Sequence, residues 1–397
     1  MPLKEKIKAH AKALHPQVTA WRKHLHAHPE LAFEEHETAA FIASILKENG
    51  IEFKTGVAKT GIVGLIKGKN PNKKCIALRA DMDALPITET NTFDHVSKNI
   101  GKMHACGHDF HSASLLGTAI ILQNHKNDFE GTVKLIFQPS EERLPGGASV
   151  MIKEGVLENP KVEKIIGQHV SPELKTGTIG ICPGKFMASA DEIYLTVKGK
   201  GGHAAFPHNT VDPVIIAAQI LVNLQQVVSR KTSPFDPAVL SFGKVIANGA
   251  TNVIPYEVKI EGTFRAMNET FRKEAHQWIK NICESTAQSL GGSCETDIKV
   301  GYPCLENEPK FTEQAKQAAT HFLDAQTVID IPQRMGAEDF AYYTQQIPAC
   351  FYRIGTGKNE NTQHGQHTSN FEIDDEALLN STGTMAWIAI HALNSSD

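Results

Sequence analysis

The first half of the chain alternates short apolar runs with segments of helical periodicity, and this alternation constrains the fold more than any other sequence feature. The runs are rich in β-branched residues and bounded by Gly and Pro, which is typical of strands. Strands that alternate with helices pair in parallel, because a parallel neighbour requires a long crossover connection. We therefore predict an α/β fold with a largely parallel sheet. The predicted strands are residues 61–68, 75–86, 131–142 and 162–172, and the predicted helices are residues 37–50, 112–123 and 146–157.

A different pattern occupies the third quarter of the 397-residue chain. Its order is strand, helix, strand, strand, helix, strand, which is typical of a ferredoxin-like sandwich. Helical and strand patterns then resume, as expected if the last quarter completes the first domain, and a chain of this length usually has more than one core. We predict a main domain of residues 1–187 and 303–397 with an inserted ferredoxin-like domain of residues 188–302. The predicted elements of the insertion are strands at 192–200, 238–247, 257–267 and 293–302 and helices at 212–230 and 269–290.

The composition indicates a small-molecule partner. The formal net charge is −4 with scattered Lys and Arg, which argues against a nucleic-acid or anionic membrane surface. The most apolar window, residues 211–228, is interrupted by polar residues and Pro, so it should not span a membrane. Seven cysteines without a CxxC pair suit a reducing compartment, and the charged N-terminal segment does not resemble a signal peptide. We expect a cytoplasmic protein.

The stretch MHACGHDFHS, residues 103–112, combines three imidazoles, a thiol and a carboxylate. A thiolate with an imidazole two residues further on suits zinc or a neighbouring first-row metal, so Cys106 and His108 are the first candidate ligands. Helical spacing follows the stretch, which predicts that the pair lies where a loop enters a helix. The alternative is a buried cysteine with helix-capping histidines, because cysteine is among the most commonly buried residues.

Further polar residues follow the apolar parts of three predicted strands. They are Asp81, Asp83, Glu141, Glu142 and His169. Ligands of parallel α/β sheets bind beyond the carboxyl ends of the strands, so this placement predicts a site. In the adjacent Glu pair one carboxylate can bind metal while the other removes a proton from water. Alone, a Glu pair is usually solvated surface, and a single His is more often structural than a ligand.

Motifs along nearly the whole chain resemble those of the metal-dependent N-acyl-amino-acid amidohydrolases. This family includes hippurate hydrolases, aminoacylases and indole-acetyl-amino-acid hydrolases, and is related to zinc aminopeptidases and carboxypeptidases. The resemblance implies a catalytic α/β domain with a small ferredoxin-like lid or dimerisation domain. The motifs are MHACGHD, FQPSEE, GQHVSPELKTGTIG, GKGGHAAFPH, TNVIP, MGAEDFAYY and HTSNFEIDDE.

The resemblance also implies two divalent metal ions per subunit, either zinc or manganese, cobalt or nickel. The ligands that it implies are Cys106, His108, Glu142, His169 and His367. Cys106 would bridge the metals, and Glu141 would be the catalytic base. Only the family pattern favours His367 over the nearby His364. Many relatives carry His at the position of Asp81, so one common ligand is absent, and the cysteine motif is expected to compensate.

Four other residues receive roles from the resemblance. His203 in the inserted domain would polarise the scissile carbonyl in the site of a partner subunit, which implies a homodimer or a higher homo-oligomer. Asn252 and Arg265 would hold the substrate, although Arg265 could instead lie on a solvated strand face. Asp83 would orient a ligand imidazole, or else cap the end of its strand.

The function expected from these residues is hydrolysis of the amide of an N-acyl-L-amino acid, hippurate-like or acetylated, to a carboxylate and a free amino acid. One alternative is dipeptidase or carboxypeptidase action by the same site. Another is a non-catalytic metal-binding or ligand-binding protein, in which Glu141 would have no task. Hydrolysis with the Cys106 thiolate as nucleophile is a further possibility. The sequence does not identify the acyl group, the amino acid or the native metal.

Overall fold

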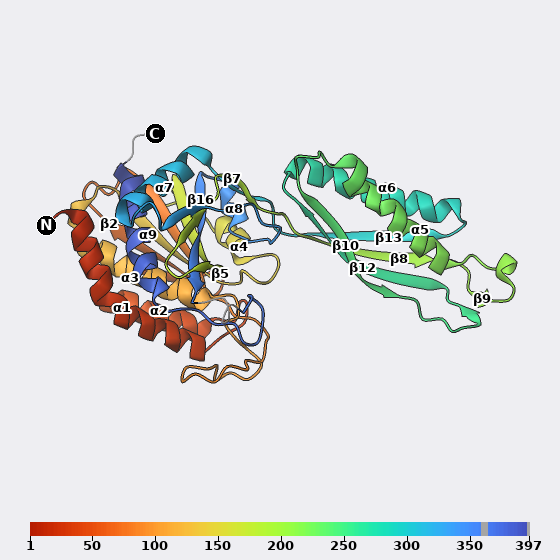
Figure 1. Cartoon of the computed structure of the whole chain (residues 1–397), viewed down its shortest axis with the longest axis horizontal. Coiled ribbons are helices and arrows are strands. Elements are labelled where there is room, and N and C mark those ends of the chain that lie inside the picture. The colour runs from red at the N-terminus through yellow and green to blue at the C-terminus, as the bar shows by residue number, and fades with distance from the viewer. Residues whose placement is uncertain (359–363, 395–397) are drawn as a thin grey trace. The chain divides into compact units, whose positions relative to one another are not determined.

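The chain forms two compact units in the computed structural model, which describes residues 1–358 and 364–394. Figure 1 shows their elements, coloured along the chain. The chain passes between the units in β7 (Gly184–Met187) and β14 (Leu305–Asn307). The second unit also contains Gln333–Glu338, a segment that the sequence did not assign to it. The first unit consists of Met1–Gly184, Glu306–Pro332 and Asp339–Asp397, and the remainder of the second is Lys185–Leu305.

An eight-stranded sheet forms the centre of the first unit. In spatial order its strands are β1 (Glu52–Val57), β2 (Gly61–Lys67), β4 (Thr132–Gln138), β3 (Cys75–Asp81), β5 (Lys164–Lys175), β16 (Ala349–Gly357), β6 (Ile179–Ile181) and β15 (Val328–Asp330).

The sheet is mixed, so the prediction of a largely parallel sheet is correct only in part, for its middle strands and for the edge pair of β6 and β15. β4, β3, β5 and β16 pair in parallel, whereas β2 is antiparallel to both β1 and β4, and β6 is antiparallel to β16. Only residues 58–60 connect β1 to β2. Such a short connection permits an antiparallel hairpin but no parallel crossover.

Helices pack against this sheet and against one another. α3 is buried along almost its whole length, because α1 and α9 pack against it and it also contacts β3 (Figure 1). A Cβ atom at Gly117 of α3 would lie 2.7 Å from Thr382 and 2.8 Å from Val18, so glycine permits this close packing. The helices of the first unit are α1 (Leu3–Ala27), α2 (His36–Glu48), α3 (His108–Asn124), α4 (Gly147–Lys153), α7 (Pro309–Phe322), α8 (Ala341–Thr344) and α9 (Ala377–Asn394).

The second unit has its own core between a four-stranded antiparallel sheet and two helices. The strands have the order β10 (Ala238–Ile246), β12 (Glu257–Ala266), β8 (Asp191–Lys198) and β13 (Ser293–Val300), and the helices are α5 (Pro213–Gln226) and α6 (Glu269–Ser289). The predicted succession of strands and helices is confirmed for each of these six elements. Asp212 and Asn268 explain where the helices begin, since each side chain accepts hydrogen bonds from the first-turn amides.

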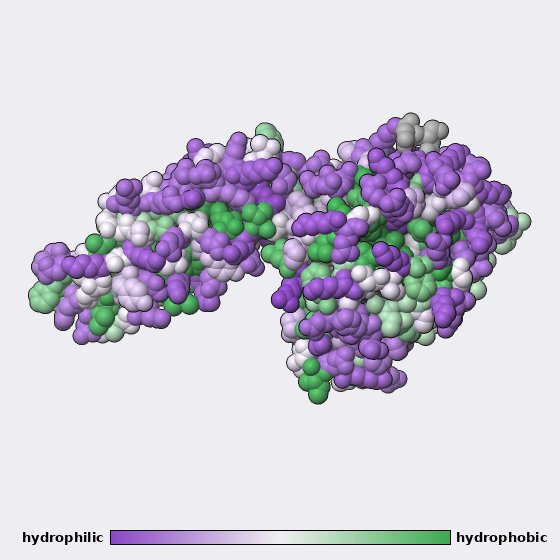
Figure 2. Space-filling view, turned by 180° about the vertical axis from the view of Figure 1, so that it is seen from behind, coloured by the Kyte–Doolittle hydropathy of each residue, from purple (hydrophilic) through white to green (hydrophobic). Residues whose placement is uncertain are grey.

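The face of the molecule shown in Figure 2 is mainly hydrophilic, with small hydrophobic areas. Within residues 1–358 and 364–394, no helix has both the length and the apolar character needed to cross a membrane. All seven cysteines are free thiols.

Candidate metal centre

Three adjoining parallel strands bring the predicted residues to one edge of the large sheet. β3 lies between β4 and β5 and is parallel to both, so the carboxyl ends of the strands are neighbours. Asp81 is the last residue of β3, and Glu141 and Glu142 follow the end of β4. His169 lies within β5, inside the predicted strand 162–172, and is opposite Arg353 of β16.

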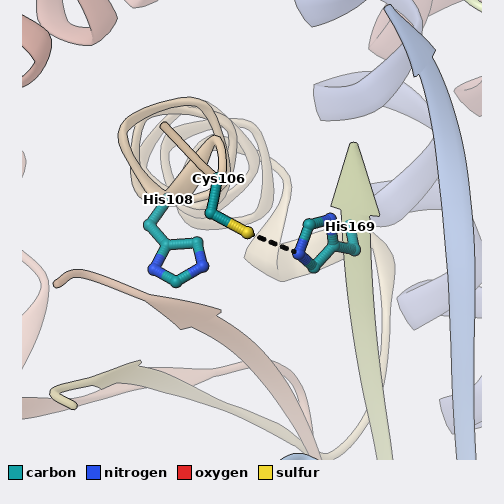
Figure 3. Close-up of side chains that lie close together, drawn as sticks. All are labelled: Cys106, His108 and His169. Carbon is teal, nitrogen blue, oxygen red and sulfur yellow. Dashed lines mark hydrogen bonds between the residues drawn. The ribbon is translucent and has the colours of Figure 1, made fainter. Parts of the chain in front are cut away.

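The loop before α3 places the thiol and the first imidazole in the site. Gly107 has a φ of +98°, and a Cβ atom there would lie 2.5 Å from Val170, so only glycine fits between the two ligand candidates. Cys106 is buried, and its Sγ lies 3.5 Å from Nε2 of His169. Figure 3 shows Cys106 and His108 approaching from the start of α3, with His169 opposite on β5.

His108 is the first residue of α3 and is fully buried. Its Nδ1 lies 2.9 Å from the backbone oxygen of Asp83 and 3.2 Å from Oδ1 of the same residue. Its Nε2 is also buried but has no hydrogen-bond partner. Burial alone would lower the pKa of His108, but Asp81 and Cys106 overcome this effect and raise the pKa well above its ordinary value. A buried ring nitrogen without a hydrogen-bond partner, close to a thiol and to carboxylates, is suited to bind a metal ion. The metal ion would then take the place of the proton on this nitrogen.

The Glu pair is held through its backbone. The amide nitrogens of Glu141 and Glu142 donate to the two carboxylate oxygens of Asp83, each over 2.9 Å. Oε1 of Glu141 accepts a hydrogen bond from the amide of Asp339 over 3.3 Å. Asp83 therefore links the imidazole of His108 to both glutamates, as expected of a residue that orients a ligand.

His367 comes from the loop before α9 and reaches the same group. Its Nε2 lies 3.1 Å from Oε1 of Glu142, and its backbone has a left-handed φ of +63°. Hydrogen bonds to Cys106 and Glu142 raise the pKa of His367 to about 10. Both histidines are exposed, but the ring of His364 contacts the side-chain amide of Asn370 instead. The geometry therefore distinguishes the two histidines, which the residues alone did not.

The potential ligand atoms form overlapping groups in which all atoms lie within 4.8 Å of one another. Two of these groups share the Cys106 thiol, and a third places Glu141 beside two of the ligands. A thiol that belongs to two groups can bridge two metal ions, and the donor set of thiolate, imidazole and carboxylate suits zinc and its neighbours. These three groups are Cys106 with His108 and His169, Cys106 with Glu142 and His367, and His108 with Glu141 and Glu142; two further groups join Asp81 with His108 and His111, and Glu141 with Glu338 and Asp339.

A buried ion-pair network supports the site, and the sequence did not reveal it. Arg79 donates to Asp81 and to Asp339, both over 2.7 Å, and its side chain is fully buried. Nδ1 of His111 lies 2.6 Å from Asp81, while its Nε2 accepts from the amide of Val170, so neither nitrogen is available to a metal. Burial would raise the pKa of Asp81, but the neighbouring cations hold it well below its ordinary value. The available signal was an arginine inside the apolar run CIALRAD, since a buried charge needs partners.

The other predicted site residues lie in the second unit. His203 forms β9 (Gly202–His203), which pairs with β11 (Val253–Ile254), and the amide of Ala204 donates to the backbone oxygen of Asn252 over 3.0 Å. The side chains of His203 and Asn252 are exposed. Arg265 lies at the far end of β12, paired with Val239 and half-buried, so the structure does not group it with the other two.

Known proteins share the sequence and fold of this chain. The family profile described as Peptidase family M20/M25/M40 matches residues 77–390. An N-acyl-L-amino acid amidohydrolase from Geobacillus stearothermophilus is 44% identical over 75% of this chain and 80% of its own length. Thermostable carboxypeptidase 2 from Saccharolobus solfataricus is 35% identical over 99% of this chain and 100% of its own length. The crystal structure of a dinuclear metal-binding M20 peptidase from Bacillus subtilis has a TM-score of 0.84 and 36% identity, covering 97% of this chain and 100% of that one.

Proposed function

The chain belongs to peptidase family M20/M25/M40 and is a metal-dependent amidohydrolase, and on this premise we propose that it cleaves N-acyl-L-amino acids to a carboxylate and a free amino acid. The observation that carries this proposal is the pair of ligand groups that share Cys106 beside Glu141. Similarity to an N-acyl-L-amino acid amidohydrolase supports the substrate class.

We propose that two divalent metal ions bind per subunit, zinc or alternatively manganese, cobalt or nickel. Their ligands would be Cys106, His108, Glu142, His169 and His367, with Cys106 shared by both ions. When bound, such ions supply Lewis acidity to the scissile carbonyl and increase the acidity of water. The dinuclear relative from Bacillus subtilis supports the number of ions.

Glu141 would act as the general base and then as the general acid. It would take a proton from the attacking water as the new carbon–oxygen bond forms, and give that proton to the amide nitrogen as the carbon–nitrogen bond breaks. Asp83 and Asp339 would keep Glu141 in place, through hydrogen bonds with its amide and with its carboxylate. These transfers leave a carboxylic acid and a neutral amine, and the acid then gives up its remaining proton, so that the products in neutral water are a carboxylate and an ammonium group.

The second unit would serve as a ferredoxin-like lid and dimerisation domain in a homodimer or higher homo-oligomer. We propose that His203 polarises the scissile carbonyl in the site of a partner subunit, and that Asn252 and Arg265 hold the substrate. β9 pairs with β11, so that His203 lies opposite Val253, the residue after Asn252, and both side chains are exposed; this placement supports a joint role for His203 and Asn252.

Two rival activities remain to be compared with this proposal, a peptidase reaction at the same metal site and hydrolysis by a cysteine nucleophile. Dipeptidase or carboxypeptidase action would use the same metal ligands and is favoured by the similarity to a thermostable carboxypeptidase. A thiol nucleophile is disfavoured, because burial and the nearby Glu142 raise the pKa of Cys106, whereas a nucleophilic cysteine needs a lowered pKa.

A substrate panel tests the proposal. The purified chain is loaded in turn with zinc, manganese, cobalt or nickel, and is assayed with benzoyl, acetyl and indole-acetyl amino acids and with dipeptides. Release of free amino acid is measured by chromatography. We expect the highest kcat/KM on an acyl amino acid and no turnover after chelation. A higher kcat/KM on dipeptides would assign the site to a peptidase instead.

A further inference from the structure

Glu35 is a fully buried carboxylate that contacts the segment carrying the Glu pair. Its Oε1 accepts a hydrogen bond from the amide of Ser140 over 2.8 Å, and its Oε2 accepts one from the hydroxyl of Thr60 over 2.6 Å. Ser140 directly precedes Glu141. Burying a carboxylate costs free energy, and hydrogen bonds must offset that cost. We therefore ask what this buried carboxylate contributes to the structure.

Its own helix does not supply that explanation. Glu35 occupies the N-cap position of α2, yet its side chain makes no capping hydrogen bond. The carboxylate of Glu30 takes that role, since its oxygens accept from the amides of Glu37 over 3.2 Å and Thr38 over 2.8 Å. The side chain of Glu35 is therefore directed to a segment 105 residues further along the chain.

The contacted residue has an unfavourable backbone conformation. Ser140 has a φ of +54°, a left-handed value that is uncommon for residues other than glycine and that persists where the surroundings hold it. Both of its backbone groups are bound, the amide by Glu35 and the carbonyl by the amide of Gly147 over 2.7 Å. The turn at Ser140 precedes the two amides that donate to Asp83. Three successive amides thus donate to two buried carboxylates.

We propose that Glu35 is a positioning residue for the catalytic segment, because it fixes the turn at Ser140 and so the placement of Glu141 and Glu142. This assignment rests on the proposed function, which gives Glu141 its role as the base and Glu142 its role as a metal ligand. A residue that served stability alone would change the free energy of unfolding without changing the order of this segment or its affinity for metal.

The test compares Glu35→Ala, which removes the acceptor, with Glu35→Gln, which retains an acceptor oxygen and the shape. Burial raises the pKa of Glu35 to about 7, so a large share of this side chain is an uncharged carboxylic acid near neutral pH. The uncharged amide of glutamine is therefore a close substitute for it. The matched control is Glu154→Ala, because Glu154 also accepts from a backbone amide, that of Ala58 over 2.9 Å, but does not contact the catalytic segment. Each full-length variant is examined by amide hydrogen exchange of the peptide covering 138–143 and by zinc titration against a fluorescent chelator.

We expect faster exchange in this peptide and zinc affinity lower by about 10- to 100-fold in Glu35→Ala, the range typical for loss of a residue that orients a ligand. Glu35→Gln and Glu154→Ala should resemble the wild type in both measurements. If Glu35→Ala does not fold, Glu35→Asp replaces it, because aspartate keeps the charge but withdraws the acceptor by one methylene group.

Wild-type exchange and zinc affinity in the folded Glu35→Ala or Glu35→Asp variant would overturn the proposal. So would equal losses in Glu35→Gln, since the acceptor would then not be what matters. Neither measurement requires turnover. A wild-type chain that binds zinc but hydrolyses none of the acyl amino acids would contradict the proposed function and leave this test intact.

Discussion

Asp83 Oδ1 lies 3.2 Å from Nδ1 of His108, and the two oxygens of this carboxylate also accept hydrogen bonds from the backbone amides of Glu141 and Glu142. Because Nδ1 of the imidazole faces Asp83, Nε2 faces the thiol of Cys106 and the carboxylates. One buried side chain therefore aligns three of the groups on which metal binding and proton transfer depend.

The first prediction is that Asp83→Asn weakens zinc binding by about 10- to 100-fold, because an amide cannot accept from both glutamate amides and the imidazole at once. Zinc titration against a chelator measures this loss. Asp128→Asn is the control, since Asp128 also contacts a histidine, with 3.1 Å to Nδ1 of His125, but on the surface. Equal zinc affinity in the two variants would refute the orienting role.

Substitution of Glu141 and of Glu142 should have different effects on metal content and on turnover. Glu141→Gln should keep the metals and lose turnover by several orders of magnitude, since the amide cannot take a proton, whereas Glu142→Gln should lose metal. Elemental analysis and single-substrate kinetics of both variants measure the difference. Equal metal loss in both would contradict this division of roles.

Cys106→Ser should lower the metal content and leave no functional hydrolase, because an un-ionised hydroxyl is a poor replacement for a bridging thiolate. Elemental analysis before and after dialysis provides the measurement. A serine variant with full metal and full activity would return Cys106 to the role of an ordinary buried cysteine.

Much of the candidate site could be predicted because its signals are local. Cys106, His108 and the Glu pair lie in short motifs or beside strand ends, and parallel strands adjoin at their carboxyl ends. The six main elements of the second unit were equally clear, since each has a strong hydrophobic periodicity, whereas the two-residue strands β9 and β11 were not predicted. β1 was missed because it is an exposed edge strand with few apolar residues.

The supporting contacts could not be predicted because they join distant parts of the chain. Glu35 and Ser140 are 105 residues apart, and Arg79 and Asp339 are 260 apart. No periodicity connects such pairs. A charge inside an apolar run indicates that a partner must exist, but the fold alone identifies which residue it is.

The second unit should lose stability in acid through Asp191. Burial alone would raise the pKa of this carboxyl, but hydrogen bonds from Arg272 and His276 lower it from 3.8 to about 2. A lowered pKa in the folded state stabilises the fold above the unfolded value and loses that effect as the pH falls, here between about pH 4 and pH 2. The shift corresponds to about 2 kcal/mol.

Unfolding of the wild type and of Asp191→Asn at pH 6 and at pH 2 tests this expectation. The difference between their free energies of unfolding should narrow by about 2 kcal/mol at the lower pH, because the protonated aspartic acid has lost its ionic contribution. An unchanged difference would show that Asp191 is not ionised in the folded state or that its partners do not stabilise it.

The last prediction concerns His203, which lies in the second unit while every proposed metal ligand lies in the first. His203 must then be delivered either within its own chain or by a partner subunit, and we propose the partner. His203→Ala and Glu141→Ala should each be nearly inactive alone. After the two are unfolded and refolded together, about half of the dimers should be mixed, each with one complete site of two, which restores roughly a quarter of normal activity. Without delivery from the partner, no subunit has both residues and nothing is recovered. Mixed dimers confirmed by mass but no more active than the separate variants would therefore eliminate the partner and leave delivery of His203 within one chain.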